Sequence, residues 1–169
     1  MSTSFPTGLD SLSNPTATDK QNNPDHATQH ANANDAIEAI QAKLGIDSSA
    51  VTTSHDYKLT PKIITMTEVV GTPNTADIDL SKNGAKTIYK LTMTQDNTLT
   101  VSNATVGDVI RLILAQDGSG SHTPTFFSTI SWSGGSAPTV TSTASKSDMY
   151  VFVITSAGNY AGFIVGQNF

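Results

Sequence analysis

The sequence predicts a mainly β protein with three parts: an extended N-terminal arm, a short trimeric α-helical coil and a C-terminal antiparallel β-sandwich of jelly-roll type. Two observations lead to this prediction. Ser, Thr and Asn are far more frequent than in ordinary globular chains, which is typical of short strands and turns with hydroxylated outer faces. The spacing of apolar residues also changes, from a helical period before residue 46 to a strand-like period after residue 61.

Residues 1–23 are predicted to form the arm. This segment is polar, and its large apolar side chains after the initiator are Phe5, Leu9 and Leu12. Such a composition cannot bury enough surface to fold alone. The segment is therefore either a disordered tail or an arm that becomes ordered when these three residues dock on a partner. We take the three as candidate partner-binding residues.

Residues 24–45 are predicted to form a helix and its stop. Asn23 is a suitable N-cap, Pro24 suits the first helical position, and Gly45 suits the position after the last turn. One stripe of side chains recurs in steps of four and three residues: His26, His30, Ala33, Ile37, Ile40 and Leu44. This spacing is that of a coiled-coil seam, and isoleucine at both kinds of seam position favours trimers. Three heptads are short, so we expect the following domain to help hold the trimer.

The pair His26 and His30 allows a second interpretation. Histidines four residues apart on a helix can chelate zinc, but typical catalytic sites add a third ligand and a base, as in His-Glu-x-x-His. The intervening residues here are Ala27, Thr28 and Gln29, and no carboxylate follows at ligand spacing. We therefore predict no metal or cofactor, and we expect the two histidines to form a polar end of the seam that acid would loosen.

Residues 46–61 read as a polar connector, and residues 62–169 as the sandwich. Turn-forming residues separate ten candidate strands: 62–70, 76–81, 86–94, 97–102, 108–116, 123–127, 129–132, 138–142, 148–156 and 160–169. Strands without intervening helices favour an antiparallel sandwich. Segments 109–114 and 149–154 are apolar on both faces, so we expect one face to meet the other sheet and one to meet a neighbour.

Composition argues against several classes of function. Charged residues are 14% of the chain and the net charge is −5, which argues against binding to nucleic acid. No run approaches the roughly 18 apolar residues of a membrane span. Cysteine is absent, so no thiolate site is available. There is also no nucleophile elbow and no phosphate-binding loop, and we predict that the chain is not an enzyme.

Three weaker chemical signals have simpler structural explanations. Asp77 and Asp79 should lie about 7 Å apart on one face of a strand, a separation that inverting glycosidases use, but such pairs are usually solvated surface. The segment from Gly118 to His122 reads as a turn before the strand at Pro124 rather than a reactive site. Four aromatic residues suit the core better than a sugar-binding face: Phe126, Phe127, Trp132 and Tyr160.

Two segments resemble proteins of tailed bacteriophages. "NNPDHATQHANANDAIEAIQAKLGID" followed by "SHDYKL" resembles a segment that precedes exposed fibre or decoration domains in phage structural proteins. The part from "ADIDLSKNGAKTIYKLTMTQDNTLTVSN" to the end resembles the terminal β-sandwich of phage fibre proteins, with its "LILAQDGSG" hairpin. The Trp-Gly-Gly-Pro loop of that family reads "WSGGSAP" here, over residues 132–138.

The resemblance implies a homotrimer on the virion surface, made in the host cytoplasm. A long tail fibre carries a long shaft, whereas the shaft here is one short helix, which favours a capsid decoration protein or a short head fibre. Its partner would be the major capsid protein or another virion protein, bound through the N-terminal arm. The alternative is a receptor-binding tail fibre or fibre tip that recognises host glycan.

Overall fold

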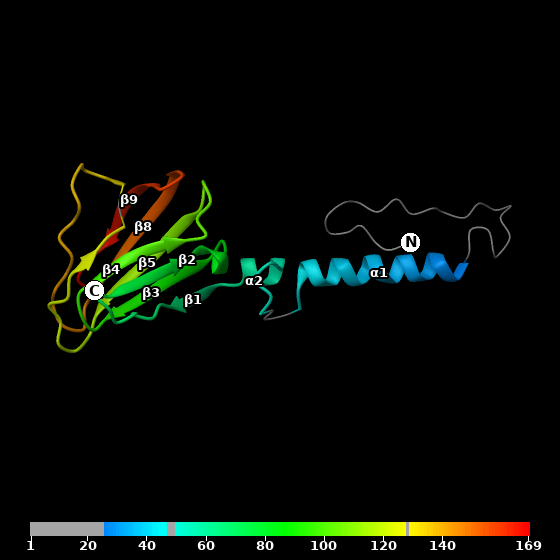
Figure 1. Ribbon diagram of the computed structural model, residues 1–169, viewed down its shortest axis with the longest axis horizontal. Coiled ribbons are helices and arrows are strands. Elements are labelled where there is room, and N and C mark those ends of the chain that lie inside the picture. Colours follow the sequence, from blue (N-terminus) through cyan, green and yellow to red (C-terminus); the bar gives the residue numbers. More distant parts are fainter. Residues whose placement is uncertain (1–25, 47–49, 128) are drawn as a thin grey trace. The chain divides into compact units, whose positions relative to one another are not determined.

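The computed structural model describes residues 26–46, 50–127 and 129–169, and the fold is mainly β (Figure 1). The chain divides into two compact units, Met1–Thr60 and Pro61–Phe169. The predicted arm, with Phe5, Leu9 and Leu12, lies outside the described residues. Within the described part, neither helix is both long and apolar enough to cross a membrane.

The predicted helix is confirmed as α1 (His26–Leu44). It ends at Gly45, which adopts a left-handed φ of +84° and donates its N–H to the Gln41 carbonyl at 2.8 Å. The residue at this stop must be small, because a Cβ on Gly45 would lie 2.8 Å from Ser54 Oγ. The predicted connector contains a short helix that the sequence prediction missed, α2 (His55–Leu59), whose N-cap Ser54 accepts from the Tyr57 N–H.

Nine of the ten predicted strands are present in the described residues. They are β1 (Lys62–Thr65), β2 (Thr75–Asp79), β3 (Thr87–Met93), β4 (Asn97–Ser102), β5 (Val109–Gln116), β6 (Pro124–Thr125), β7 (Ile130–Trp132), β8 (Ser147–Ser156) and β9 (Asn159–Gly166). A 3₁₀ turn, η1 (Leu80–Lys82), follows β2. The predicted strand at 138–142 is wrong: this segment is a loop in which Val140 packs against the core.

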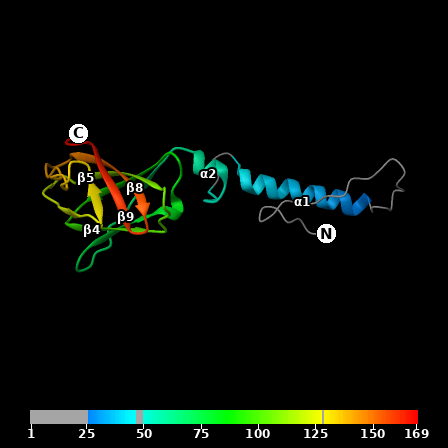
Figure 2. The ribbon, with the colours of Figure 1, turned by 90° about the horizontal axis from the view of Figure 1, so that it is seen from above.

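The strands form two sheets, and the predicted antiparallel jelly roll is wrong. One sheet has the order β1-β3-β5-β8-β9-β7 and the other β2-β4-β6. All pairs in the smaller sheet are parallel, and β1, β3 and β5 are parallel in the larger one. Antiparallel pairing within the sheets is confined to the two partners of β8 (Figures 1 and 2). A jelly roll is built from antiparallel Greek keys, so its pairing differs.

The chain alternates between the two sheets from β1 to β6, which explains the parallel pairing. Parallel neighbours need a long crossover, and each even-numbered strand provides one by crossing in the opposite sheet. Lys62 pairs with Thr87 and Tyr89 with Leu112, so successive turns of the chain stack with a repeat of about two dozen residues. This part of the unit resembles the stacked turns of a solenoid.

The core of the sheet unit contains apolar residues from both sheets. Its largest fully buried side chains include Tyr89, Tyr150 and Phe152 from the larger sheet and Ile78 and Leu99 from the smaller one. Of the four aromatic residues that were expected in the core, Tyr160 belongs to it, and Phe126, Phe127 and Trp132 are partly buried and pack against it. Their rings meet edge to face, with centroids 5.2 Å apart for Phe126 and Trp132 and 4.5 Å apart for Phe127 and Tyr160. Their burial fixes the two sheets against each other.

Candidate functional site

The predicted seam lies on α1, and its apolar side chains are open in the single chain. Ile37 is 51% exposed, Ile40 46% and Leu44 55%. Helical spacing places these three on one face, together with the half-buried Ala33. His26 is the first residue of α1, and His30 is exposed. The structure therefore presents an apolar stripe, and we define the α1 stripe as Ala33, Ile37, Ile40 and Leu44.

The α1 stripe is too narrow to be one side of a broad core. Helices that pack on a globular core bury a wide apolar face, whereas a stripe in steps of three and four residues suits a coiled-coil seam. The opposite face of α1 carries Asp35, Glu38 and Ala42, all exposed. The α1 stripe is suited to bind another apolar stripe along its length.

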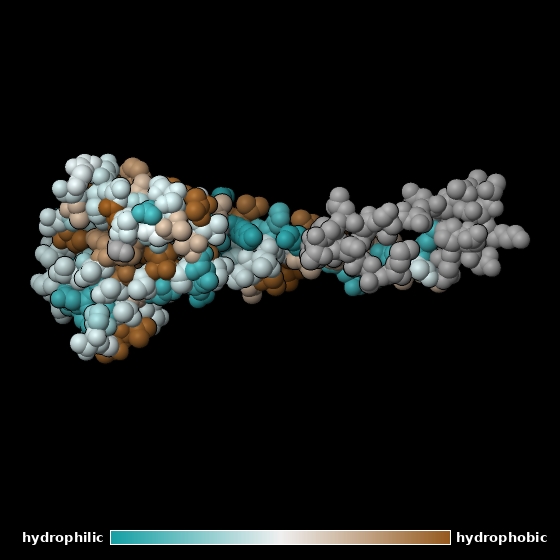
Figure 3. All heavy atoms as spheres, turned by 45° about the horizontal axis from the view of Figure 1, so that its top comes forward, coloured by the Kyte–Doolittle hydropathy of each residue, from teal (hydrophilic) through white to brown (hydrophobic). Residues whose placement is uncertain are grey.

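A second exposed apolar surface lies on the side of the six-stranded sheet that faces away from the core. Side chains alternate across a strand, and the residues between the core positions of β1, β3, β5, β8 and β9 point outward. We call them the outer apolar face: Ile63, Ile88, Val109, Ile113, Met149, Val151, Val153, Ala161 and Phe163. Figure 3 shows apolar side chains reaching the surface of the sheet unit among polar ones.

The sequence prediction found only part of this surface. It assigned a neighbour to segments 109–114 and 149–154, because they are apolar on both faces. It missed Ile63, Ile88 and Phe163, whose strands mix polar and apolar residues on the outer side. The available signal was the alternation itself: Phe163 lies one residue from the buried Gly162, so it must point away from the core.

The outer face of the smaller sheet has a different character. It carries hydroxyl and carboxylate groups: Thr75, Asp77, Thr98, Thr100, Ser102 and Thr125. The Asp77 carboxylate accepts from Thr100 Oγ1 at 2.8 Å and from Ser102 Oγ at 2.5 Å. The threonines of β4 point outward while Leu99 is buried. Of the aromatic residues that could have formed a sugar-binding platform, Tyr160 lies in the core and the other three pack against it.

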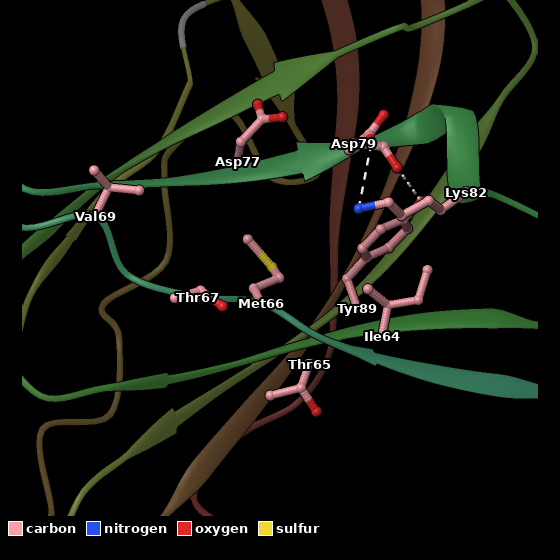
Figure 4. Close-up of a pocket in the computed structure, with 9 residues that line it drawn as sticks. All are labelled: Ile64, Thr65, Met66, Thr67, Val69, Asp77, Asp79, Lys82 and Tyr89. Atoms are coloured by element: carbon pink, nitrogen blue, oxygen red, sulfur yellow. Dashed lines mark hydrogen bonds and ion pairs between the residues drawn. The ribbon is translucent and has the colours of Figure 1, made fainter.

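Asp77 and Asp79 also line a cavity of about 290 Å³ beside β1 and β2 (Figure 4). Asp79 accepts from the Ser81 N–H at 3.0 Å and from Asn103 Nδ2 at 2.8 Å, and it pairs with Lys82 at 3.5 Å. Hydrogen bonds from Asn103 and Ser81, with the charge of Lys82, lower the pKa of Asp79 to about 2. A carboxyl group that is ionised above pH 2 is a poor general acid at neutral pH, which argues against Asp79 in that glycosidase role.

The segment from Gly118 to His122 is a turn organised by Asp117, in agreement with the prediction. Asp117 Oδ1 accepts from the N–H groups of Ser119 at 2.8 Å and Gly120 at 2.9 Å, and it lies 3.0 Å from His122 Nε2. The two backbone hydrogen bonds and the His122 ring lower the pKa of Asp117. These contacts give Asp117 and His122 a structural role in the loop before β6.

Among the residues that the structure describes, no three His, Asp or Glu side chains gather as metal ligands would. Comparison with protein family models, with curated proteins and with solved structures finds no match to this chain. The α1 stripe and the two sheet faces are therefore the features from which a function can be argued.

Proposed function

We propose that this chain is a structural protein of a tailed-bacteriophage particle, displayed on the capsid surface as a homotrimeric decoration protein or short head fibre. Its function is binding rather than catalysis. The observation that carries the proposal is the α1 stripe, in which Ile37, Ile40 and Leu44 are each about half exposed in the single chain. The resemblance of "NNPDHATQHANANDAIEAIQAKLGID" to segments of phage structural proteins points the same way.

The number of copies follows from the residues in the stripe. Isoleucine at both kinds of seam position, here Ile37 and Ile40, favours three strands over two. A helix of 19 residues is about 28 Å long, and coils of this length are marginal alone. The sheet unit, which has its own core, is expected to contribute to trimer stability.

The N-terminal arm provides the attachment in this proposal. Residues 1–23 precede α1, so a trimer carries three arms that start from one end of the coil. Phe5, Leu9 and Leu12 would dock on the major capsid protein or another virion protein. Three arms on one particle raise the effective concentration of each, so weak single contacts combine into firm attachment.

The exposed chemistry of the smaller sheet favours decoration over receptor recognition. A sugar-binding fibre tip commonly stacks sugars on exposed aromatic rings, whereas this face carries threonine, serine and aspartate. The alternative, a receptor-binding tail fibre that recognises host glycan, is favoured by one feature. The cavity of Figure 4 combines the carboxylates of Asp77 and Asp79 with the ammonium group of Lys82, groups that bind sugar hydroxyls.

The test is to locate the protein on phage particles and to remove the arm. Immunogold labelling with antibody against this chain should mark the head, whereas label at the tail tip would favour the alternative. Label on neither would contradict the proposal. A variant that lacks residues 1–20 should remain a folded trimer but no longer attach to capsids. If this variant decorates particles as well as the full chain, attachment does not depend on the arm.

A further inference from the structure

The outer apolar face resembles the centre of a protein interface. Ile63 is 60% exposed and Phe163 43% exposed, and the other members are half-buried by neighbours in their own sheet. None of the nine belongs to the core cluster or packs against it. Polar residues surround them on the same side of the sheet: Thr65, Thr92, Ser131, Ser147 and Thr155. An apolar centre with a polar rim is the usual anatomy of a protein interface.

The register shows that the apolar side chains are contiguous. Val151 is paired with Arg111 on one side and with Phe163 on the other. Ile113 is paired with Met149, and Val109 with Val153, which is in turn paired with Ala161. Neighbouring strands are about 4.8 Å apart, so these residues touch across the sheet. Strands that are apolar on both faces, as β5 and β8 are, normally lie buried on both sides.

We infer that the outer apolar face is the surface through which the sheet units of three copies of this chain pack around a threefold axis. The inference rests on the proposed function, because the trimer of α1 supplies the copies. Once α1 has assembled, three identical faces are tethered within reach of one another, and their effective concentration far exceeds that of any free partner. The occupant of this face is therefore a second copy of the chain.

The width of the face fits a threefold arrangement. Eight of its nine residues lie on β3, β5, β8 and β9, which are adjacent in the sheet. Four strands span about 19 Å. If three sheets of this width form the sides of a triangular prism, each sheet lies about 5.5 Å from the threefold axis. Two sheets that pack face to face are ~10 Å apart, so each lies about 5 Å from the plane between them, which is nearly the same distance. Side chains from the three faces would thus meet at the axis without a void.

Two cations on this side of the sheet fit the same arrangement. Lys90 lies on β3, which forms a corner of the prism, and it is exposed. Val109, Val153 and Ala161 are paired across the sheet and form the row of residues at one end of the face. Arg111 lies on β5 in the next row. Rows on one side of a strand are about 7 Å apart, a distance that an arginine side chain can span. Its stem would cover apolar neighbours while the guanidinium reaches solvent.

The area of the face explains why α1 is needed as well. Four strands over the length of the apolar rows cover roughly 400 Å² of sheet, below the ~800 Å² per partner of a stable interface. The face alone should associate weakly, and the α1 stripe should supply the remaining contact. Loss of either surface should therefore weaken the trimer.

The experiment uses single cysteines in the full chain, which contains none of its own. Phe163→Cys places a thiol on the outer apolar face, and Thr125→Cys places one on the outer face of the smaller sheet as the control; both positions are exposed in the single chain. Reaction with a maleimide should be at least tenfold slower at position 163 than at position 125. The second measurement is mass: Val151→Glu should shift the protein toward monomer, whereas Thr125→Glu should leave its mass unchanged.

The outcomes separate this inference from the proposed function. A trimer in which both cysteines react equally fast overturns the role of the outer apolar face but leaves the α1 trimer standing. Conversely, slow reaction at position 163 that persists when Ile37 and Ile40 are both changed to Asn supports the face and contradicts the role of α1. A monomeric full chain at tens of micromolar overturns both.

Discussion

Ile37 and Ile40 on the α1 stripe allow the trimer to be tested by a quantitative perturbation. The double change Ile37→Asn and Ile40→Asn replaces two apolar seam residues by smaller, polar ones. In the single chain, Ile37 is 51% and Ile40 46% exposed, so about half of each side chain remains to be buried on assembly. Fully burying an isoleucine contributes about 1.5–3 kcal/mol, which gives about 1 kcal/mol for each half-exposed residue.

The effect is repeated in every copy of the chain. Two residues in three chains amount to about 6 kcal/mol per trimer, and each 1.4 kcal/mol is a factor of ten, so the association constant should fall by about 10⁴. The concentration at which half of the protein is trimeric varies as the square root of that constant. It should therefore rise by about 100-fold. Desolvation of the asparagine side chains would add to this loss.

Sedimentation equilibrium over a range of concentrations measures this midpoint. The matched control is Asp35→Asn with Ala42→Asn, because both residues are exposed on the opposite face of α1 and the new residues have the same helix propensity. The control should leave the midpoint unchanged within a few-fold. If the stripe variant and the control have the same midpoint as the unmodified protein, the α1 stripe does not hold the copies together.

Two further predictions concern the sheet unit. Gly120→Ala should lower the melting temperature markedly, because Gly120 has a φ of +66° and a Cβ there would lie 2.6 Å from the Ala144 nitrogen. The control is Gly118→Ala, where a Cβ has open space. Equal melting temperatures of the two variants in thermal unfolding would contradict the reasoning. Asp148→Asn should cost about 1–3 kcal/mol of unfolding free energy, because the Asp148 carboxylate accepts from the Thr141 N–H, the Asn168 N–H and the Tyr150 hydroxyl. Burial would raise the pKa of Asp148, but these hydrogen bonds outweigh burial and lower it. The contribution of the ionised Asp148 to folding stability is therefore fully present above the pKa of an ordinary aspartate, and it is lost as the pH falls through the lowered pKa of the folded state. Asp148→Asn should therefore lose less stability than the unmodified protein between neutral and acid pH. An unchanged acid dependence of urea unfolding would show that Asp148 does not contribute in this way.

Local patterns predicted most of the secondary structure. The end of α1 at Gly45 follows from the need for a left-handed residue after the last turn. Alternation predicted β4 with the bounds that the structure shows, and a run that is apolar on both faces and bounded by turn signals predicted β5 to within one residue. The short helix α2 was missed, since five residues carry no helical period, although Ser54 before Asp56 is a recognisable start signal.

Strand pairing could not be read in the same way. The absence of helices between strands favoured antiparallel pairing, but here short connections such as that from β3 to β4 carry the chain from one sheet to the other. The alternation of apolar and polar residues predicts which side chains are buried, but it does not predict which strand lies beside which. Parallel and antiparallel sheets therefore have the same pattern in the sequence. The loop at 138–142 has the composition of a strand, yet the Thr141 N–H donates to the Asp148 side chain rather than to a neighbouring strand.

The candidate surfaces were predictable to different degrees. The α1 stripe follows from spacing alone, and it is present on the helix as expected. The outer apolar face depends on which strands are adjacent, because Phe163 and Arg111 become members of one row only through their pairing with Val151. The contacts of Asp77 and Asp79 with hydroxyl and amide groups of β4 and the residue after it likewise required the parallel pairing of β2 with β4.

The most direct test of the homotrimer is the mass of the unmodified full chain in solution. Sedimentation equilibrium at micromolar concentrations should give three times the 17.7 kDa mass of one chain. The value should hold over at least a tenfold range of concentration if the α1 stripe and the sheet units act together. A mass of one chain throughout that range would contradict the proposed assembly, and a mass of two chains would contradict the assignment of Ile37 and Ile40 to a three-stranded seam.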